Sequence, residues 1–137
     1  MKINSIGSWC EIGGKRFYAR SKAETRYAIQ LQFLKDSKLI LDWNHEPTTF
    51  WFEEIKRGVR SYKPDFQVRE NDGTWWWAEV KGFLDGKSRT KIKRFAKYYP
   101  GETLRIIDSR TLMPIKLEKL EKLALKAKIS AKRTKND

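Results

Sequence analysis

Cysteine and histidine are almost absent from this sequence, which contains one residue of each. The single cysteine, Cys10, excludes a disulfide bond within the chain, and we expect it to be a small apolar filler of the interior. No cluster of Cys and His residues exists that could build a structural zinc site. The fold must therefore be held together by its hydrophobic core, without disulfide bonds or zinc.

Long hydrophobic runs are absent as well. No segment approaches the roughly 20 consecutive apolar residues that a membrane-spanning helix needs. The first residues, 1–5, have no apolar centre of a signal peptide, so an intracellular location is the default expectation. The sequence has no internal repeat and no linker long enough to separate domains, and its 137 residues suit one domain with a real core.

Acidic residues are scarce relative to basic ones. The chain has 30 Lys and Arg against 17 Asp and Glu, which gives a formal net charge of +13. A charge this large on a small domain predicts a polyanionic partner, most often nucleic acid, with an anionic membrane surface as the competing interpretation. Hydrophobic residues make up 39% of the chain and aromatic residues 13%, so we expect it to fold.

The hydrophobic pattern predicts an α/β domain in which helices flank a mixed sheet. In chain order we expect a hairpin over 9–19, a helix over 21–35, one long or two short strands over 39–52, a hairpin over 65–81, a helix over 88–99, a strand over 104–107 and a helix from 114 to about 129.

The most informative motif is Pro64-Asp65 followed by Glu79-Val80-Lys81, with a turn signal at 71–73 between them. A hairpin brings Asp65 and Glu79 together at one end of a sheet, and Glu79 and Lys81 share a face of their strand. Two carboxylates and an ammonium group can hold a divalent cation and activate water for phosphodiester cleavage. A solvated strand edge is the alternative, since this spacing arises by chance in roughly a few per cent of such chains.

Glu24 is the best candidate for a third carboxylate, because it lies in the first turn of the first predicted helix. Ser21-x-x-Glu24 is also a capping box, in which Glu24 reaches back to the Ser21 amide. His45 and Glu46, just before Pro47, are lesser candidates for the site: Glu46 could be another acidic residue near it, but a glutamate at this place is more often a charge at a strand end.

Together these motifs resemble the PD-(D/E)xK nuclease superfamily, over about residues 9–108. The resemblance is carried by a glutamate on an early helix, Pro-Asp on one strand and Glu-x-Lys-Gly on the next, followed by a basic helix. The segments 20–24, 62–66, 79–82 and 91–100 are similar to those of phage-encoded members, including resolvase-like endonucleases that cut Holliday junctions. The fold that this implies is a restriction-endonuclease-like core.

The resemblance also implies roles for individual residues. Glu24, Asp65, Glu79 and the Val80 carbonyl would bind the metal, and Lys81 would orient the attacking water and stabilise charge on the phosphate. Because the ligands are all hard oxygens, Mg²⁺ is the expected cofactor, and Mn²⁺ should substitute. If the enzyme is phage-encoded, it would act in the host cytoplasm, in DNA recombination.

A DNA-binding surface is predicted around the second basic helix, because the segment 86–99 contains no acidic residue. An ordinary solvated helix, the alternative, usually carries both signs of charge. With two further basic segments, the candidate DNA-binding residues are Arg20, Lys22, Lys63, Lys87, Arg89, Lys91, Lys93, Arg94 and Lys97.

The three consecutive tryptophans at 75–77 must alternate between the two faces of a strand, with Trp75 and Trp77 on the face of Glu79. We interpret them as core and cross-strand packing, although an exposed one could stack on a base.

The expected organisation is a nuclease domain over residues 1–112 and a basic helix and tail over 113–137. The second part would pack on the domain or form a dimer interface, and a homodimer would suit symmetric cutting of two strands. Two other functions stay open: a restriction-like or single-strand-processing nuclease of the same fold, and a DNA-binding module without catalysis.

Overall fold

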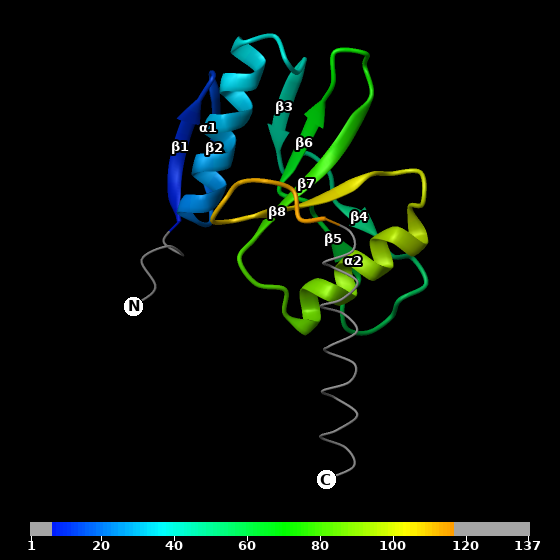
Figure 1. The fold of residues 1–137 in the computed structure, drawn as a ribbon. Helices are drawn as coiled ribbons and strands as arrows, with labels where there is room; N and C mark the ends of the chain where they lie inside the picture. Colours follow the sequence, from blue (N-terminus) through cyan, green and yellow to red (C-terminus); the bar gives the residue numbers. More distant parts are fainter. Residues whose placement is uncertain (1–6, 117–137) are drawn as a thin grey trace.

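The computed structural model of the chain describes residues 7–116. Its centre is a four-stranded sheet with the strand order β3–β6–β7–β8 (Figure 1). The strands are β3 (Asp42–His45), β6 (Phe66–Arg69), β7 (Trp75–Lys81) and β8 (Leu104–Asp108). β6 pairs antiparallel with both β3 and β7, whereas β8 pairs parallel with β7, so the sheet is mixed. With α1 (Lys22–Asp36) and α2 (Gly86–Tyr98) packed around it, the predicted α/β class is confirmed, and the arrangement is consistent with a restriction-endonuclease-like core.

Two short antiparallel pairs accompany the sheet. The predicted opening hairpin is formed by β1 (Ser8–Ile12) and β2 (Lys15–Ala19), and it lies along α1 (Figure 1). The pair of β4 (Phe50–Trp51) and β5 (Ser61–Tyr62) lies beside α2. The segment 39–52 therefore forms two short strands, one in the sheet and one outside it, because the chain bends around Pro47.

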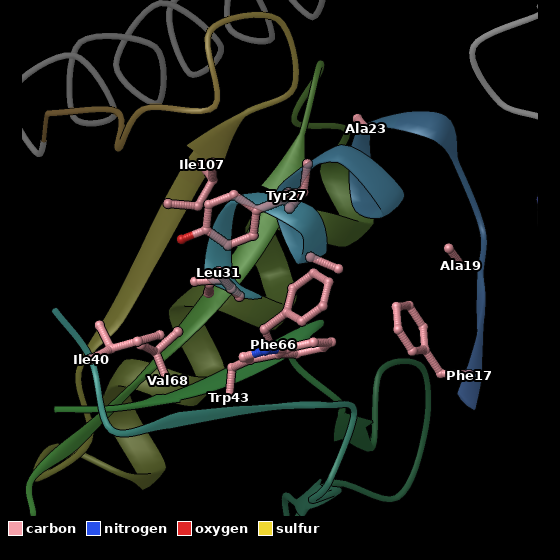
Figure 2. Close-up of a cluster of buried hydrophobic side chains, with 13 residues drawn as sticks. Phe17, Ala19, Ala23, Tyr27, Leu31, Ile40, Trp43, Phe66, Val68 and Ile107 are labelled. Atoms are coloured by element: carbon pink, nitrogen blue, oxygen red, sulfur yellow. The ribbon is translucent and has the colours of Figure 1, made fainter. Parts of the chain in front are cut away.

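Each face of the sheet has its own hydrophobic cluster, since alternate residues of β7 point to opposite faces. Ala78 and Val80 belong to the larger cluster, on the face that α1 and the β1–β2 hairpin cover. Figure 2 shows this cluster, with labelled members from α1, the hairpin and the sheet. Trp43 and Phe66 are fully buried at its centre. Trp77 points the other way, into the cluster between the sheet and α2, where Phe50 packs edge-on against it at 5.0 Å. The predicted packing role of Trp77 is thus confirmed.

Two expectations about helices are corrected. The second helix begins at Gly86 and not at Ser88, because Asp85 is its N-cap and accepts a hydrogen bond from the Ser88 amide at 2.7 Å. No helix begins at Pro114: this residue forms a bridge with Ile107, and the Ile115 amide donates to the Ile106 carbonyl at 2.7 Å. Pairing with β8 provides hydrogen bonds to the backbone of residues 114–116 and holds this segment extended.

The remainder of the predicted C-terminal helix, residues 117–137, lies outside the described residues. The packing or dimerisation role of residues 113–137 accordingly stays a prediction. Of the helices within residues 7–116, neither is long and apolar enough to cross a lipid bilayer.

Candidate active site

The β6–β7 hairpin brings the two parts of the main motif together. Its register pairs Phe66 with Ala78, and one further step in the same register places Asp65 opposite Glu79. Glu79 lies on the face of Trp77, because residues two apart in a strand share a face, and Asp65 lies just before the start of β6. Both are buried, with exposed fractions of 3% for Asp65 and 7% for Glu79. A solvated strand edge is therefore wrong as a description of this motif.

Asp65 is fixed by the backbone of the neighbouring strand. Its Oδ2 accepts a hydrogen bond from the Val80 amide at 2.8 Å, which extends the hairpin ladder through a side chain. In an extended strand the N–H and C=O of one residue point to the same side. The Val80 carbonyl is thus directed towards the Asp65 side of β7, as a backbone ligand at this site requires.

Glu79 is held between a tyrosine and a lysine. The hydroxyl of Tyr62, on β5, donates to Glu79 Oε2 at 2.5 Å, and Lys81 Nζ lies 3.7 Å from Glu79 Oε1. Burial, followed by the charge of Glu79, raises the pKa of Tyr62 well above its ordinary value, so this hydroxyl remains a donor. The side chain of Lys81 is 35% exposed, so it is partly accessible to solvent.

Glu24 lies in the first turn of α1, and the predicted capping box forms only in part, because the Glu24 carboxylate reaches the amide of Arg20 and not that of Ser21. Ser21 is the N-cap and its Oγ accepts from the Glu24 amide at 3.2 Å. The Glu24 carboxylate accepts from the amide of Arg20, one residue before the cap, at 3.2 Å. This capping contact uses Oε2, which also lies 3.4 Å from His45 Nε2. The carboxylate is buried, so it is more than a surface cap.

The three carboxylates act on one another electrostatically. Burial raises the pKa of Asp65 well above its ordinary value, and the charges of Glu79 and Glu24 raise it further. Burial also raises the pKa of Glu79, against the lowering effects of the Tyr62 hydrogen bond and the Lys81 and Lys91 charges. Negative charge is crowded here beyond what the local lysines neutralise, which is the condition that favours cation binding.

The residues fit a hard divalent cation by the chemistry of their donors. Within residues 7–116 the hydrogen bonds to these carboxylates reach one oxygen of each, Glu24 Oε2, Asp65 Oδ2 and Glu79 Oε2. The second oxygens of Glu24 and Asp65 are left for a cation, whereas Glu79 Oε1 also faces Lys81 Nζ at 3.7 Å. Oxygen ligands are those that Mg²⁺ prefers. No three acidic, His or Cys side chains of the described part are already drawn together as a metal cluster. Metal binding would therefore require side-chain adjustment.

Glu46 and His45 lie closer to the site than the sequence indicated. The Glu46 amide donates to the Asp65 carbonyl at 2.8 Å, and its Oε1 lies 2.8 Å from Arg20 Nη2 without a well-directed hydrogen bond. Glu46 also has a left-handed backbone, with φ of 45°, which is uncommon for a residue other than glycine. His45 stacks on Phe17 at 4.5 Å. Apart from their place just before Pro47, nothing in the sequence indicates that these two residues lie near Asp65 and Glu24.

Tyr62 lies in the candidate site although the sequence analysis assigns it no role. Its contact with Glu79 joins β5 to β7, which belong to different sheets, so no local pattern predicts it. The one sequence feature that could have indicated this contact is the position of Tyr62, three residues before Asp65. This spacing is weak evidence unless the course of the chain between β5 and β6 is known.

The predicted DNA-binding residues fall into two groups. Arg20 and Lys63 both pair with Glu46, at 2.8 and 4.0 Å, and Lys22 is exposed at the start of α1. On α2, Arg89 and Arg94 donate to the backbone carbonyls of Leu84 and Val59, which carry no net charge. Lys87, Lys93 and Lys97 are exposed. No residue of α2 makes an ion pair within the described range, so this helix keeps its full positive charge.

Comparison with known proteins gives a family but no activity. A search of the curated proteins found no match. A family model described as "Protein of unknown function (DUF1064)" matches residues 9–113, a range that includes Glu24, Asp65, Glu79, Lys81 and the whole of α2. Because this match covers most of the chain, the protein belongs to the DUF1064 family.

Proposed function

We propose that this chain is a metal-dependent DNA endonuclease that hydrolyses phosphodiester bonds in branched or otherwise structured DNA. The observation that supports it is the burial of three carboxylates, Glu24, Asp65 and Glu79, near enough for the charges of Glu24 and Glu79 to act on Asp65. Burying ionisable groups is costly unless they are paired or bind a metal, and functional sites are where such groups cluster.

The proposed reaction assigns a task to each side chain. A bound Mg²⁺ would polarise the scissile phosphate and make a water nucleophilic at neutral pH. Glu24, Asp65, Glu79 and the Val80 carbonyl would hold the cation. Lys81, next to Glu79, would donate to the developing negative charge on the phosphate. Tyr62 would orient Glu79, and the Val80 amide would orient Asp65.

DNA is the substrate that the charge distribution favours. A helix with no acidic residue and no ion pair within the described range follows directly on the strand that carries Glu79 and Lys81. Such a helix can hold phosphates on either side of the scissile bond. The preference for branched DNA rests on the resemblance to resolvase-like phage endonucleases, and it would place the enzyme in the host cell cytoplasm.

The decisive experiment is a cleavage assay with Mg²⁺, with Mn²⁺ and without metal, on a four-way junction, a linear duplex and a single strand. We expect metal-dependent cutting, strongest on the junction. Strongest cutting of the duplex or the single strand would instead favour a restriction-like or single-strand-processing nuclease. Asp65→Asn and Glu79→Gln should lose cleavage and keep DNA binding, whereas Glu11→Gln, which removes an exposed carboxylate on β1, should change neither. Cleavage that survives in either site variant would show that the site lies elsewhere.

A DNA-binding module without catalysis is the second candidate, and one observation favours it. Within residues 7–116 the acidic side chains are not already arranged around a common point. Calorimetric titration with Mg²⁺ separates the two candidates, because the module should bind DNA but release no heat with the metal. Lys81→Ala serves as the control that keeps all three carboxylates and should lose cleavage alone.

Symmetric cutting of a junction requires two active sites, so the proposal includes a homodimer. Light scattering at micromolar concentration tests this state directly. An active monomer would exclude the dimer while leaving the nuclease proposal intact.

A further inference from the structure

Phe83 is the most exposed of the large hydrophobic side chains within residues 7–116, with an exposed fraction of 78%. It lies in the short connection from β7 to α2, two residues after Lys81. Two residues span at most about 7 Å, so Phe83 is beside the proposed catalytic lysine. An exposed aromatic residue at this place needs an explanation that the proposed cleavage chemistry does not supply.

The connection is held at both ends, so the exposure of Phe83 belongs to an ordered loop. Gly82 packs closely on Ser109, whose Oγ would lie 2.7 Å from a Cβ at this position, and the Ser109 amide donates to the Lys81 carbonyl at 3.1 Å. On the other side, Arg89 donates to the Leu84 carbonyl at 3.2 Å. These contacts fix the backbone on either side of Phe83, while its ring is left in solvent.

The surroundings of Phe83 are positively charged. Lys81 precedes it, Lys87 and Arg89 follow in the first turn of α2, and Lys91 is close enough for its charge to act on both Glu79 and Asp85. A hydrophobic ring within a basic surface suits a ligand that offers phosphates and a flat apolar face at once. Nucleic acid offers both, since every base has a π-face and every step a phosphate.

We propose that Phe83 is a wedge that stacks on a nucleobase beside the scissile phosphate and separates it from its neighbour. Apolar side chains inserted at a base step unstack it and bend the duplex. With successive phosphates of one strand about 3.4 Å apart along the axis, a phosphate at Lys81 places Phe83 within about two base steps. The inference rests on the proposed nuclease function and specifies its substrate: DNA whose stacking is already broken, as at a junction, gap or mismatch, is cut best because the wedge has less stacking to disrupt.

The test uses a fluorescent adenine analogue, aminopurine, placed next to the scissile phosphate of a linear duplex, with the cut position taken from the wild-type products. In an Asp65→Asn background, binding should raise the fluorescence as the base unstacks, and adding Phe83→Ala should abolish that rise while binding persists. The matched control is Phe33→Ala, which removes another exposed phenylalanine ring, 66% exposed, on the C-terminal half of α1. It should leave the signal unchanged.

Cleavage by the otherwise native enzyme gives a second readout. We expect Phe83→Ala to lower kcat/KM on intact duplex by about 5- to 100-fold, the range that loss of one base–aromatic stack produces. A mismatch or gap at the same step should restore much of the rate, which a merely structural defect would not allow. Circular dichroism should show both Phe variants folded, since each ring is exposed.

Three results would overturn the wedge. The first is a fluorescence rise that persists in Phe83→Ala, and the second is a cleavage defect of the same size on mismatched and intact DNA. The third is a change of oligomeric state in Phe83→Ala by light scattering, which would make the ring a contact between copies of the chain. If the wild type cuts no DNA, the proposed nuclease function fails but the wedge proposal does not. Aminopurine placed at successive positions of a bound duplex then still tests whether Phe83 unstacks a base. A chain that binds no DNA would refute both.

Discussion

The Tyr62 hydroxyl donates a hydrogen bond to Glu79 Oε2 across 2.5 Å, joining the small β4–β5 pair to the central sheet. Tyr62 is buried, and its ring packs edge-on against Phe95 of α2 at 5.6 Å. A residue outside the sheet thus fixes the orientation of a carboxylate at the centre of the candidate site.

The Tyr62→Phe variant should keep this packing and lose the hydrogen bond. A hydrogen bond to a charged group contributes about 1.5–3 kcal/mol, so we expect kcat/KM for cleavage to fall by roughly 10- to 100-fold. The Tyr62 hydrogen bond lowers the pKa of Glu79 against the larger effect of burial, so its loss should raise that pKa. The acidic limb of the pH–rate profile should therefore move to higher pH. An unchanged limb would contradict the role of Tyr62.

Asp65 makes the metal-free protein sensitive to pH. Its pKa in the folded chain is raised, chiefly by burial, so the folded state holds the proton more tightly than the unfolded state. The stability that this provides is complete below the unfolded pKa of about 3.9 and is lost as the pH rises through the folded pKa. Asp65→Asn should therefore have a higher Tm than the wild type in EDTA, by a margin that grows with pH.

Thermal unfolding of both proteins across the pH range checks this, because the difference in Tm removes the contribution of the carboxyl groups that do not interact with Asp65. Addition of Mg²⁺ should stabilise the wild type and narrow the difference. If the wild type were more stable than Asp65→Asn at neutral pH in EDTA, burial of the charged Asp65 carboxylate would not destabilise the fold, contrary to this prediction.

The charge of α2 should be visible in the salt dependence of DNA binding. Lys87→Gln and Lys93→Gln each remove an exposed charge from α2. If these lysines contact phosphates, each change should reduce the slope of log affinity against log salt by about 0.9. Lys35→Gln is the matched control, because Lys35 already pairs with Asp42 at 2.9 Å. Equal slopes in all three variants would place the DNA elsewhere on the protein.

The turn of the β1–β2 hairpin offers a stability test that separates contact from backbone strain. Gly13 and Gly14 have φ of 58° and 78°, where a side chain costs about 1–2 kcal/mol. A Cβ on Gly13 would also overlap the side-chain amide of Gln32, which accepts from Trp43 Nε1 at 2.8 Å, whereas nothing lies within 4 Å of one on Gly14. Gly13→Ala should therefore lower the free energy of unfolding more than Gly14→Ala. Equal losses in chemical denaturation would show that Gln32 moves aside freely.

The sequence alone determined the local features of this protein. Its period-two and helical hydrophobic patterns predicted the hairpins at 9–19 and 65–81, α1 and β8, because these depend on residues close together in the chain. Asp65 and Glu79 could be paired in advance for the same reason, since a tight turn fixes the register of a hairpin. The N-cap was also local, and Ser21 Oγ accepts from the Glu24 amide, but the Glu24 carboxylate accepts from the amide of Arg20 and not, as predicted, from that of Ser21.

Tertiary structure alone decided what surrounds those residues. Tyr62 reaches Glu79, and Glu46 reaches Asp65, because separate segments are packed together, and no short-range pattern encodes that distance. The extended course of 114–116 was likewise set by pairing with β8, which overrode a helical pattern in the sequence. Local chemistry thus selected the candidate ligands, whereas long-range packing buried them, crowded their charges and left Phe83 exposed beside them.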